Sequence, residues 1–182
     1  LADGNSVDAS STLAGDVVLH GNGALTLTDV DTANGNIVVT AAGDIDAQMV
    51  DAIGAGTDIN ISNSAGNILA SSVNAADTVM ITSAAGDVTV GSVTSGTTTM
   101  ISTPAGSIND AQDDTVTDIS AGGLITLTAQ DEIGALATLE LADGNSVDAS
   151  STLAGDVVLH GNGALTLTDV DTANGNIVVT AA

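Results

Sequence analysis

Acidic and amide side chains gather in three short segments, and these are the residues best suited to hold a metal ion. The segments read ADGNSVD (2–8), DVDTANGN (29–36) and NDAQDD (109–114). Ca²⁺ takes about six to eight oxygen ligands from carboxylates, amides and backbone carbonyls. The calcium candidates are Asp29, Asp31, Asp110, Asp113 and Asp114. Neither the DxDxDG loop of EF-hands nor the GGxGxD repeat of calcium β-rolls occurs, and turn formation explains most of these residues. Ca²⁺ is the only cofactor that the sequence suggests.

The two histidines, His20 and His160, occupy the same position of the phrase LHGNG, with Asp16 and Asp156 nearby in sequence. A metal site would need a second ligand at fixed spacing, as in HExxH. The chain has no Cys to act as a nucleophile, and scattered serines do not define a Ser–His–Asp triad. We therefore predict corner or surface histidines, no catalytic residue and no enzyme activity.

Two other activities of regular β-rods stay open as alternatives. Threonine-rich stretches at 24–28, 97–103 and 125–128 could form the flat hydroxyl array of an ice-binding solenoid, although Thr does not recur in every repeat. A polysaccharide-degrading β-helix enzyme would need paired carboxylates. Such enzymes usually hold sugar with aromatic or basic side chains, and this chain has no Phe, Tyr, Trp, Lys or Arg.

The charge of the chain is strongly negative and unbalanced. Among 182 residues there are 23 acidic residues and no Lys or Arg, so the formal charge is −23 at pH 7. Affinity for nucleic acids and for anionic membranes comes mainly from Lys and Arg, and no apolar run reaches the roughly 18 residues of a membrane span. We predict no nucleic-acid partner and no membrane insertion. Disorder requires low hydrophobicity, whereas 43% of the residues are hydrophobic, which indicates a folded protein.

A recurring ten-residue phrase indicates the elements that would position these side chains. It reads GDIDAQMVDA (43–52), GNILASSVNA (66–75) and GDVTVGSVTS (86–95). Apolar and polar residues alternate with period two, which predicts β-strands. A repeat of about 20–25 residues is too short for a βαβ unit. We therefore predict an all-β fold, a parallel β-helix (β-solenoid) with about 20–25 residues per coil.

In such a solenoid, equivalent positions of successive coils stack directly above one another. Each stacked column keeps its residue type because every side chain packs on its counterpart in the next coil. Three inward columns are predicted: Ile45, Ile68 and Val88; Ala47, Ala70 and Val90; and Val50, Val73 and Val93. The leading Gly marks a corner with positive φ or close backbone approach.

A much longer repeat is literal, because residues 1–42 recur unchanged as 141–182. We predict a single continuous β-solenoid over 1–182, in which 1–140 form one tandem unit of about six coils and 141–182 begin the next. Residues 109–121, the longest departure from the period, should bulge out as a solvated loop. Pro104 should lie at a corner, where no ladder hydrogen bond is lost.

The phrases GGLITLTAQDEIGA, TANGNIVVTAAGDIDA and AGTDINISNSAGNILA resemble the repeats of filamentous-haemagglutinin-like proteins, which are large bacterial exoproteins and giant adhesins. The resemblance extends over most of the chain. It implies a right-handed parallel β-helix, export across the outer membrane and a structural, non-catalytic role in an extracellular surface fibre or adhesin stalk. The expected partner is the chain itself, in tandem, end to end or in lateral bundles. A calcium-dependent adhesin of the cell surface or biofilm matrix is the alternative.

Overall fold

The computed structural model describes residues 1–182, which form strands, turns and loops but no helix. Thirteen strands make one sheet, here called sheet A: β1 (Asn5–Ser11), β3 (Leu25–Thr32), β5 (Ile45–Ala47), β6 (Val50–Ala52), β8 (Ile68–Ala70), β9 (Val73–Ala75), β11 (Val88–Val90), β12 (Val93–Ser95), β14 (Ile108–Asp110), β15 (Ile119–Ala121), β17 (Leu139–Leu141), β19 (Val157–Gly161) and β21 (Ile177–Ala181). Eight strands make sheet B: β2 (Val17–Gly21), β4 (Ile37–Ala41), β7 (Ile59–Asn63), β10 (Val79–Ser83), β13 (Thr99–Thr103), β16 (Leu124–Ala129), β18 (Ser146–Ser151) and β20 (Thr166–Thr172). The strands of both sheets pair in parallel.

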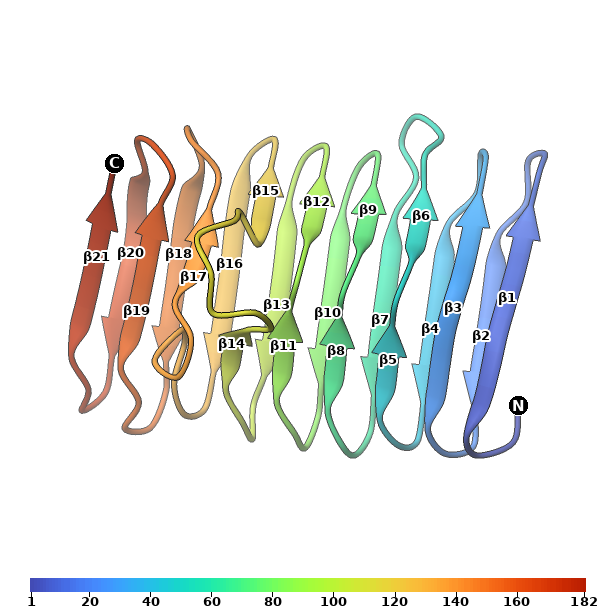
Figure 1. Ribbon diagram of the computed structural model, residues 1–182, viewed down its shortest axis with the longest axis horizontal. Coiled ribbons are helices and arrows are strands. Elements are labelled where there is room, and N and C mark those ends of the chain that lie inside the picture. Colours follow the sequence, from blue (N-terminus) through green and yellow to red (C-terminus); the bar gives the residue numbers. More distant parts are fainter.

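The chain alternates between the two sheets and so winds into about nine coils. In Figure 1, sheet A lies in front with its strands pointing up, sheet B lies behind with its strands pointing down, and the chain advances from right to left. This path is a right-handed coil, so the predicted right-handed parallel β-helix is confirmed. The shortest coils have 20 residues, as between Val79 and Thr99. Since the chain forms no helix, it contains no candidate for a membrane-spanning helix.

The predicted inward columns are confirmed. Ile45, Ile68 and Val88 are paired in register on neighbouring coils and are at most 1% exposed. The two other columns are buried in the same way, and 36 buried apolar side chains form one core cluster between the sheets. The interior holds mainly Ala, Val, Ile and Leu because the facing sheets lie only about 10 Å apart, so branched residues of constant size fill each layer.

The corners explain the recurring Gly. Gly66 adopts φ +83°, and a methyl group built on Gly86 would overlap the carbonyl oxygen of Gly66 in the preceding coil. A buried hydroxyl lies three residues before Gly86: Ser83 Oγ donates to the Gly66 carbonyl oxygen at 2.9 Å. Pro104 lies in such a turn between β13 and β14, as predicted.

The prediction for residues 109–121 is wrong in part. Residues 111–117 form the loop, but Asp110 is the last residue of β14, Asp118 is buried and residues 119–121 form β15. The insertion lies in the middle of a coil, between two short strands of sheet A. Both of its ends are therefore held inside the sheet, and only its middle reaches solvent.

The two identical segments occupy opposite sheets. In the first copy β1 and β3 belong to sheet A, whereas the matching strands of the second copy, β18 and β20, belong to sheet B. Between β1 and β18 the chain passes six times through sheet B, in β2, β4, β7, β10, β13 and β16, and β18 is the seventh pass. The offset of 140 residues is thus six and a half coils and not a whole number. The assignment of 141–182 to a further tandem unit stays a prediction.

Candidate metal centre

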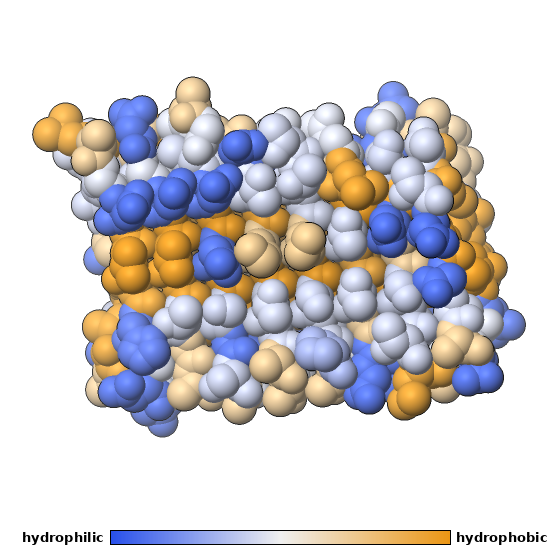
Figure 2. Space-filling view, turned by 180° about the vertical axis from the view of Figure 1, so that it is seen from behind, coloured by the Kyte–Doolittle hydropathy of each residue, from blue (hydrophilic) through white to orange (hydrophobic).

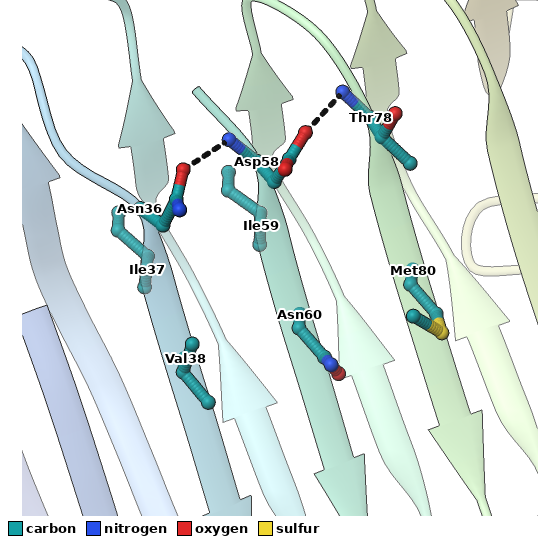
Figure 3. Close-up of a pocket in the computed structure, with 8 residues that line it drawn as sticks. All are labelled: Asn36, Ile37, Val38, Asp58, Ile59, Asn60, Thr78 and Met80. Carbon is teal, nitrogen blue, oxygen red and sulfur yellow. Dashed lines mark hydrogen bonds between the residues drawn. The ribbon is translucent and has the colours of Figure 1, made fainter. Parts of the chain in front are cut away.

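Most of the turn carboxylates and amides have a structural role that spans neighbouring coils. Asn36 Oδ1 accepts a hydrogen bond from the backbone N–H of Asp58 at 2.9 Å, and Asp58 Oδ1 accepts one from the N–H of Thr78 at 3.1 Å (Figure 3). Asp16 begins this ladder by accepting from the N–H of Asn36 at 2.8 Å. Asp156 accepts from the N–H of Asn176 in the same way. Asp16 and Asp156 therefore bond the next coil and not the histidines.

The histidines lie on outer surfaces within strands. His20 Nδ1 lies 2.7 Å from Thr40 Oγ1 in sheet B, and His160 Nδ1 lies 2.7 Å from Thr180 Oγ1 in sheet A. The prediction of surface histidines is confirmed, although both belong to strands and not to corners. His160 pairs in register with Glu140, a neighbour that His20 lacks.

The first pair of calcium candidates lies on the outer face of β3. Asp29 is exposed, and Asp31 is half-buried and accepts a hydrogen bond from Ser10 Oγ at 2.9 Å. With Asp51 and Met49 they line an open surface depression. The structure does not bring Asp29 or Asp31 together with the other candidates.

A buried group of three carboxylates is the most unusual site in the molecule. Asp110, Asp118 and Glu140 are 5%, 2% and 3% exposed, and each supplies a carboxylate oxygen within 4.8 Å of the other two. Asp110 ends β14, Asp118 precedes β15, and Glu140 is the central residue of β17 in the next coil. The group thus joins the two ends of the 111–117 loop to the following coil.

Backbone hydrogen bonds orient this acidic triad. Glu140 N–H donates to Asp118 Oδ2 at 2.7 Å, and Asp118 N–H donates to the Glu140 carbonyl oxygen at 2.8 Å. Asp110 accepts from the N–H of Gln112 at 2.9 Å and from the N–H of Asp114 at 3.3 Å. Glu140 Oε2 is buried and has no hydrogen-bond partner.

The electrostatics of the triad disfavour three negative charges. Burial raises the pKa of Asp118 to about 8, the hydrogen bond from the Glu140 amide opposes this rise, and the nearby Asp110 carboxylate adds to it. Burial also raises the pKa of Glu140, whereas its contact with Asp118 and the His160 ring lower it. The chain offers no Lys or Arg to neutralise the group. A proton or an external cation must therefore compensate the charge.

The loop that covers the triad reaches over the next two coils, those of β17 and β19. Asn162 Nδ2 donates to Thr117 Oγ1 at 2.8 Å, and Thr115 lines a surface pocket together with Glu140 and His160. Asp113 and Asp114 lie exposed in this loop, and Asp113 adopts φ 49°. Of the predicted candidates, Asp110 belongs to the triad, and Asp113 and Asp114 lie only in its covering loop.

Sequence reasoning missed Asp118 and Glu140 as candidate ligands. Asp118 was assigned to the solvated loop, and Glu140 lies 22 residues further along the chain. The available signal was compositional: Glu140 is one of only two glutamates, and it interrupts an inward–outward alternation between Leu139 and Leu141, all three of which are buried. Sequence alone gives no register between β15 and β17, so the meeting of these side chains could not be derived.

Two rows of side chains follow the strand register on the outer face of sheet B. Figure 2 shows an apolar band along this face beside a paler row. The strand register places Val18, Val38, Met80 and Met100 in the apolar band, interrupted by Asn60. The neighbouring row is made of hydroxyl side chains: Thr40, Ser62, Thr82, Ser102, Thr128 and Ser150.

Comparison with known proteins gives no match among protein-family models, curated proteins or solved structures. The resemblance of the repeats to filamentous-haemagglutinin-like proteins therefore stays a prediction.

Proposed function

We propose that this chain is a structural, non-catalytic segment of an extracellular rod, as in the stalk of a bacterial surface fibre or adhesin. The proposal is supported mainly by the continuity of the two parallel sheets, which run from β1 to β21 without interruption. Of 108 backbone hydrogen bonds, 60 lie within the strands of these sheets. Bonds between stacked coils run along the rod axis, so tension along the rod is shared by several bonds in each coil.

The rod can be lengthened without altering the coils already formed. Apart from the 111–117 loop, which also reaches Asn162 two coils away, a coil contacts its two neighbours, so the addition of further coils leaves interior ones unchanged. The end coils have unpaired strand edges, which another chain could use for pairing. Further coils of the same chain, or the end of another copy, would cover those edges and extend the rod.

The composition suits a fibre outside the cell. With no Lys or Arg, the chain offers no cleavage site to trypsin-like proteases. Its charge of −23 would hold neighbouring rods apart at low salt, and divalent cations would permit lateral bundling.

The extracellular location is tested by labelling. Antibodies against the 111–117 loop should label intact cells that make the protein. Labelling that requires permeabilised cells would contradict the extracellular part of the proposal.

The length of the particle tests the rod directly. Proteins with one, two and three 140-residue units would be measured by small-angle X-ray scattering and electron microscopy. Each unit of six and a half coils should add about 31 Å at about 4.8 Å per coil, while the cross-section stays constant. A particle that grows in all dimensions, or whose units fold back on one another, would contradict the proposal.

The hydroxyl row of sheet B favours ice binding as a second candidate function. Six successive coils present Ser or Thr at one outward position, a more regular array than the threonines alone suggest. Thermal hysteresis of the purified protein, compared with a Thr82→Lys variant, separates this function from a plain rod. An absence of hysteresis in the unaltered protein would eliminate it.

A further inference from the structure

We propose that Asp110, Asp118 and Glu140 bind one Ca²⁺ ion, which fastens both ends of the 111–117 loop to the next coil. The geometry supports a shared ion, because the three carboxylate oxygens lie within 4.8 Å of one another. Two ligands that each lie about 2.3–2.6 Å from Ca²⁺ can be separated by at most about 5 Å. The three oxygens can therefore contact the same ion without a change in the course of the backbone.

The unpartnered oxygen of Glu140 is a second observation that indicates a ligand. Glu140 is 97% buried, being 3% exposed, yet its Oε2 accepts no hydrogen bond. A buried polar atom is usually paired, and leaving one unpaired is destabilising, most of all when it is charged. Side-chain oxygens that the fold does need, such as those of Asp16 and Asp58, accept a backbone N–H. A cation among the carboxylates would give Oε2 the partner that the chain does not provide.

The type of ligand favours Ca²⁺ over other cations. The group contains only carboxylate oxygens, whereas Zn²⁺ and copper sites generally use Cys or His. Three carboxylates can supply as many as about six oxygens if all bind in bidentate fashion, which suits the flexible coordination of Ca²⁺. Mg²⁺ normally keeps several of its waters and is bound through one or two carboxylates, so a group of three buried carboxylates suits it less.

Binding would order the loop as well as neutralise the triad. Asp110 and Asp118 flank the 111–117 loop, and Glu140 belongs to the adjacent coil. An ion that contacts all three replaces mutual repulsion by attraction across the base of the loop. The exposed Asp113 and Asp114 would then be held in place, although they are outside the triad.

Thermal unfolding of the full chain in chelator and in CaCl₂ tests the site. We expect Ca²⁺ to raise the melting temperature saturably, by about 5–10 °C at a free concentration a hundredfold above Kd. Glu140→Gln should abolish this rise and should melt no lower than the unaltered protein in chelator, because it removes a repelling charge. Glu132→Gln, the matched change at the other glutamate, should keep the full rise. A rise that Glu140→Gln retains, or no rise in the unaltered protein, would overturn the proposal.

Further variants separate the site from diffuse binding to the acidic surface. Asp110→Asn should lose the Ca²⁺-dependent rise as Glu140→Gln does, which keeps the test valid if Glu140→Gln fails to fold. The double variant Asp29→Asn/Asp31→Asn removes two surface carboxylates and should retain the rise. If Asp110→Asn and the Asp29→Asn/Asp31→Asn double variant lose the Ca²⁺-dependent rise equally, Ca²⁺ only screens the acidic surface, and the proposal is wrong.

Proteolysis gives a second readout that depends on the loop. An endoprotease that cleaves before Asp residues should cut at Asp113 or Asp114 in chelator, and saturating Ca²⁺ should slow that cut at least tenfold. Cleavage at the same rate in both conditions would contradict the ordering of the loop by the ion.

Discussion

At the scale of single residues, the same amino acid has different roles according to the coil beneath it. Gly86 lies over the carbonyl of Gly66, so a methyl group there has no space, whereas a methyl group on Gly15 would meet only the side-chain oxygen of Ser11 at 3.2 Å. The two glycines lie at opposite corners of the coil, Gly15 before sheet B and Gly86 before sheet A, and Gly15 belongs to the first coil of this chain. Gly35 stacks on Gly15 at the same corner, and a methyl group there would overlap the Gly15 carbonyl oxygen. The requirement for Gly therefore comes from the stacking of coils and not from the turn alone.

The first prediction follows from this difference. Gly86→Ala should lower the free energy of unfolding by about 1–3 kcal/mol, because the added methyl group displaces backbone of the neighbouring coil. Gly15→Ala should change it by less than about 0.5 kcal/mol. Chemical denaturation of both variants measures the difference, and equal effects would show that the coils are not tightly stacked at the Gly86 corner.

The second prediction concerns the pH dependence of stability without metal. The pKa of Asp118 is about 8 in the folded protein and near 3.8 when the group is unperturbed, so between these values the folded state keeps a proton that the unfolded state has lost. Stability therefore falls as pH rises through this window. The stabilisation of the folded state by the proton on Asp118 is complete below about pH 4 and is lost above about pH 8.

Melting temperatures at pH 5 and pH 8.5 in chelator check this sign. Asp118→Asn cannot titrate and should show a smaller decrease over the same interval. Asp110 and Glu140 act on Asp118, and Asp114 and His160 act on Glu140. All four groups remain in the variant, so they contribute to both measurements. An identical pH dependence in the two proteins would rule out Asp118 as the titrating group.

At the scale of elements, the short strands are supported by ladders of turn side chains. Asn67 N–H donates to Asp44 Oδ1 at 2.7 Å, and Asn67 Oδ1 accepts from the N–H of Asp87 at 2.9 Å. Ser107 continues the ladder by donating its N–H to Asp87 Oδ1 at 2.8 Å. These bonds satisfy corner N–H groups that strand pairing does not reach, and they explain why Asp and Asn precede the strands of the repeated phrase.

The third prediction tests this ladder. Asn67→Ala removes the acceptor for the Asp87 amide and should cost about 0.5–1.5 kcal/mol of the free energy of unfolding. Asn60→Ala is the control, because the Asn60 side chain lies on the outer face of β7 and forms no hydrogen bond within the chain. A larger loss in the control would show that the ladder contributes little.

At the scale of the whole molecule, the half-coil offset places identical surfaces on opposite faces. His20 and its copy His160 belong to sheet B and sheet A. In an array of such units, each surface group would alternate between the two faces from one unit to the next. A rod of this kind could contact neighbouring rods or partners on both sides through the same residues.

The fourth prediction tests the offset by disulfide formation. Thr128 and Ser150 are paired in register on sheet B. His20 belongs to the same column of sheet B, whereas its copy His160 lies in β19 of sheet A. The double variant Thr128→Cys/Ser150→Cys should cross-link on mild oxidation, because stacked residues lie about 4.8 Å apart and disulfides span Cα separations of about 4.4–6.8 Å. Thr128→Cys/His160→Cys should remain reduced, because His160 lies in the other sheet. The reverse result would mean that the second copy follows the phase of the first.

Much of the architecture could be predicted from local patterns. The period-two alternation, the corner Gly and the constant residue type at positions such as Ile45, Ile68 and Val88 predict stacked parallel coils, and the structure confirms them. The candidate site was predicted only in part. Asp110 was recognised, Asp118 was placed in solvent and Glu140 was not considered, because their proximity depends on the register of distant strands.

By itself, then, the sequence determined the cross-section of the rod, because side chains that repeat every coil must stack on their own kind. Only the tertiary structure decided the phase of the second copy and the meeting of Asp110, Asp118 and Glu140. The physical reason is that both depend on how many residues each loop takes up. Insertions such as 111–117 shift all later strands along the coil, so identical segments can fold onto opposite sheets.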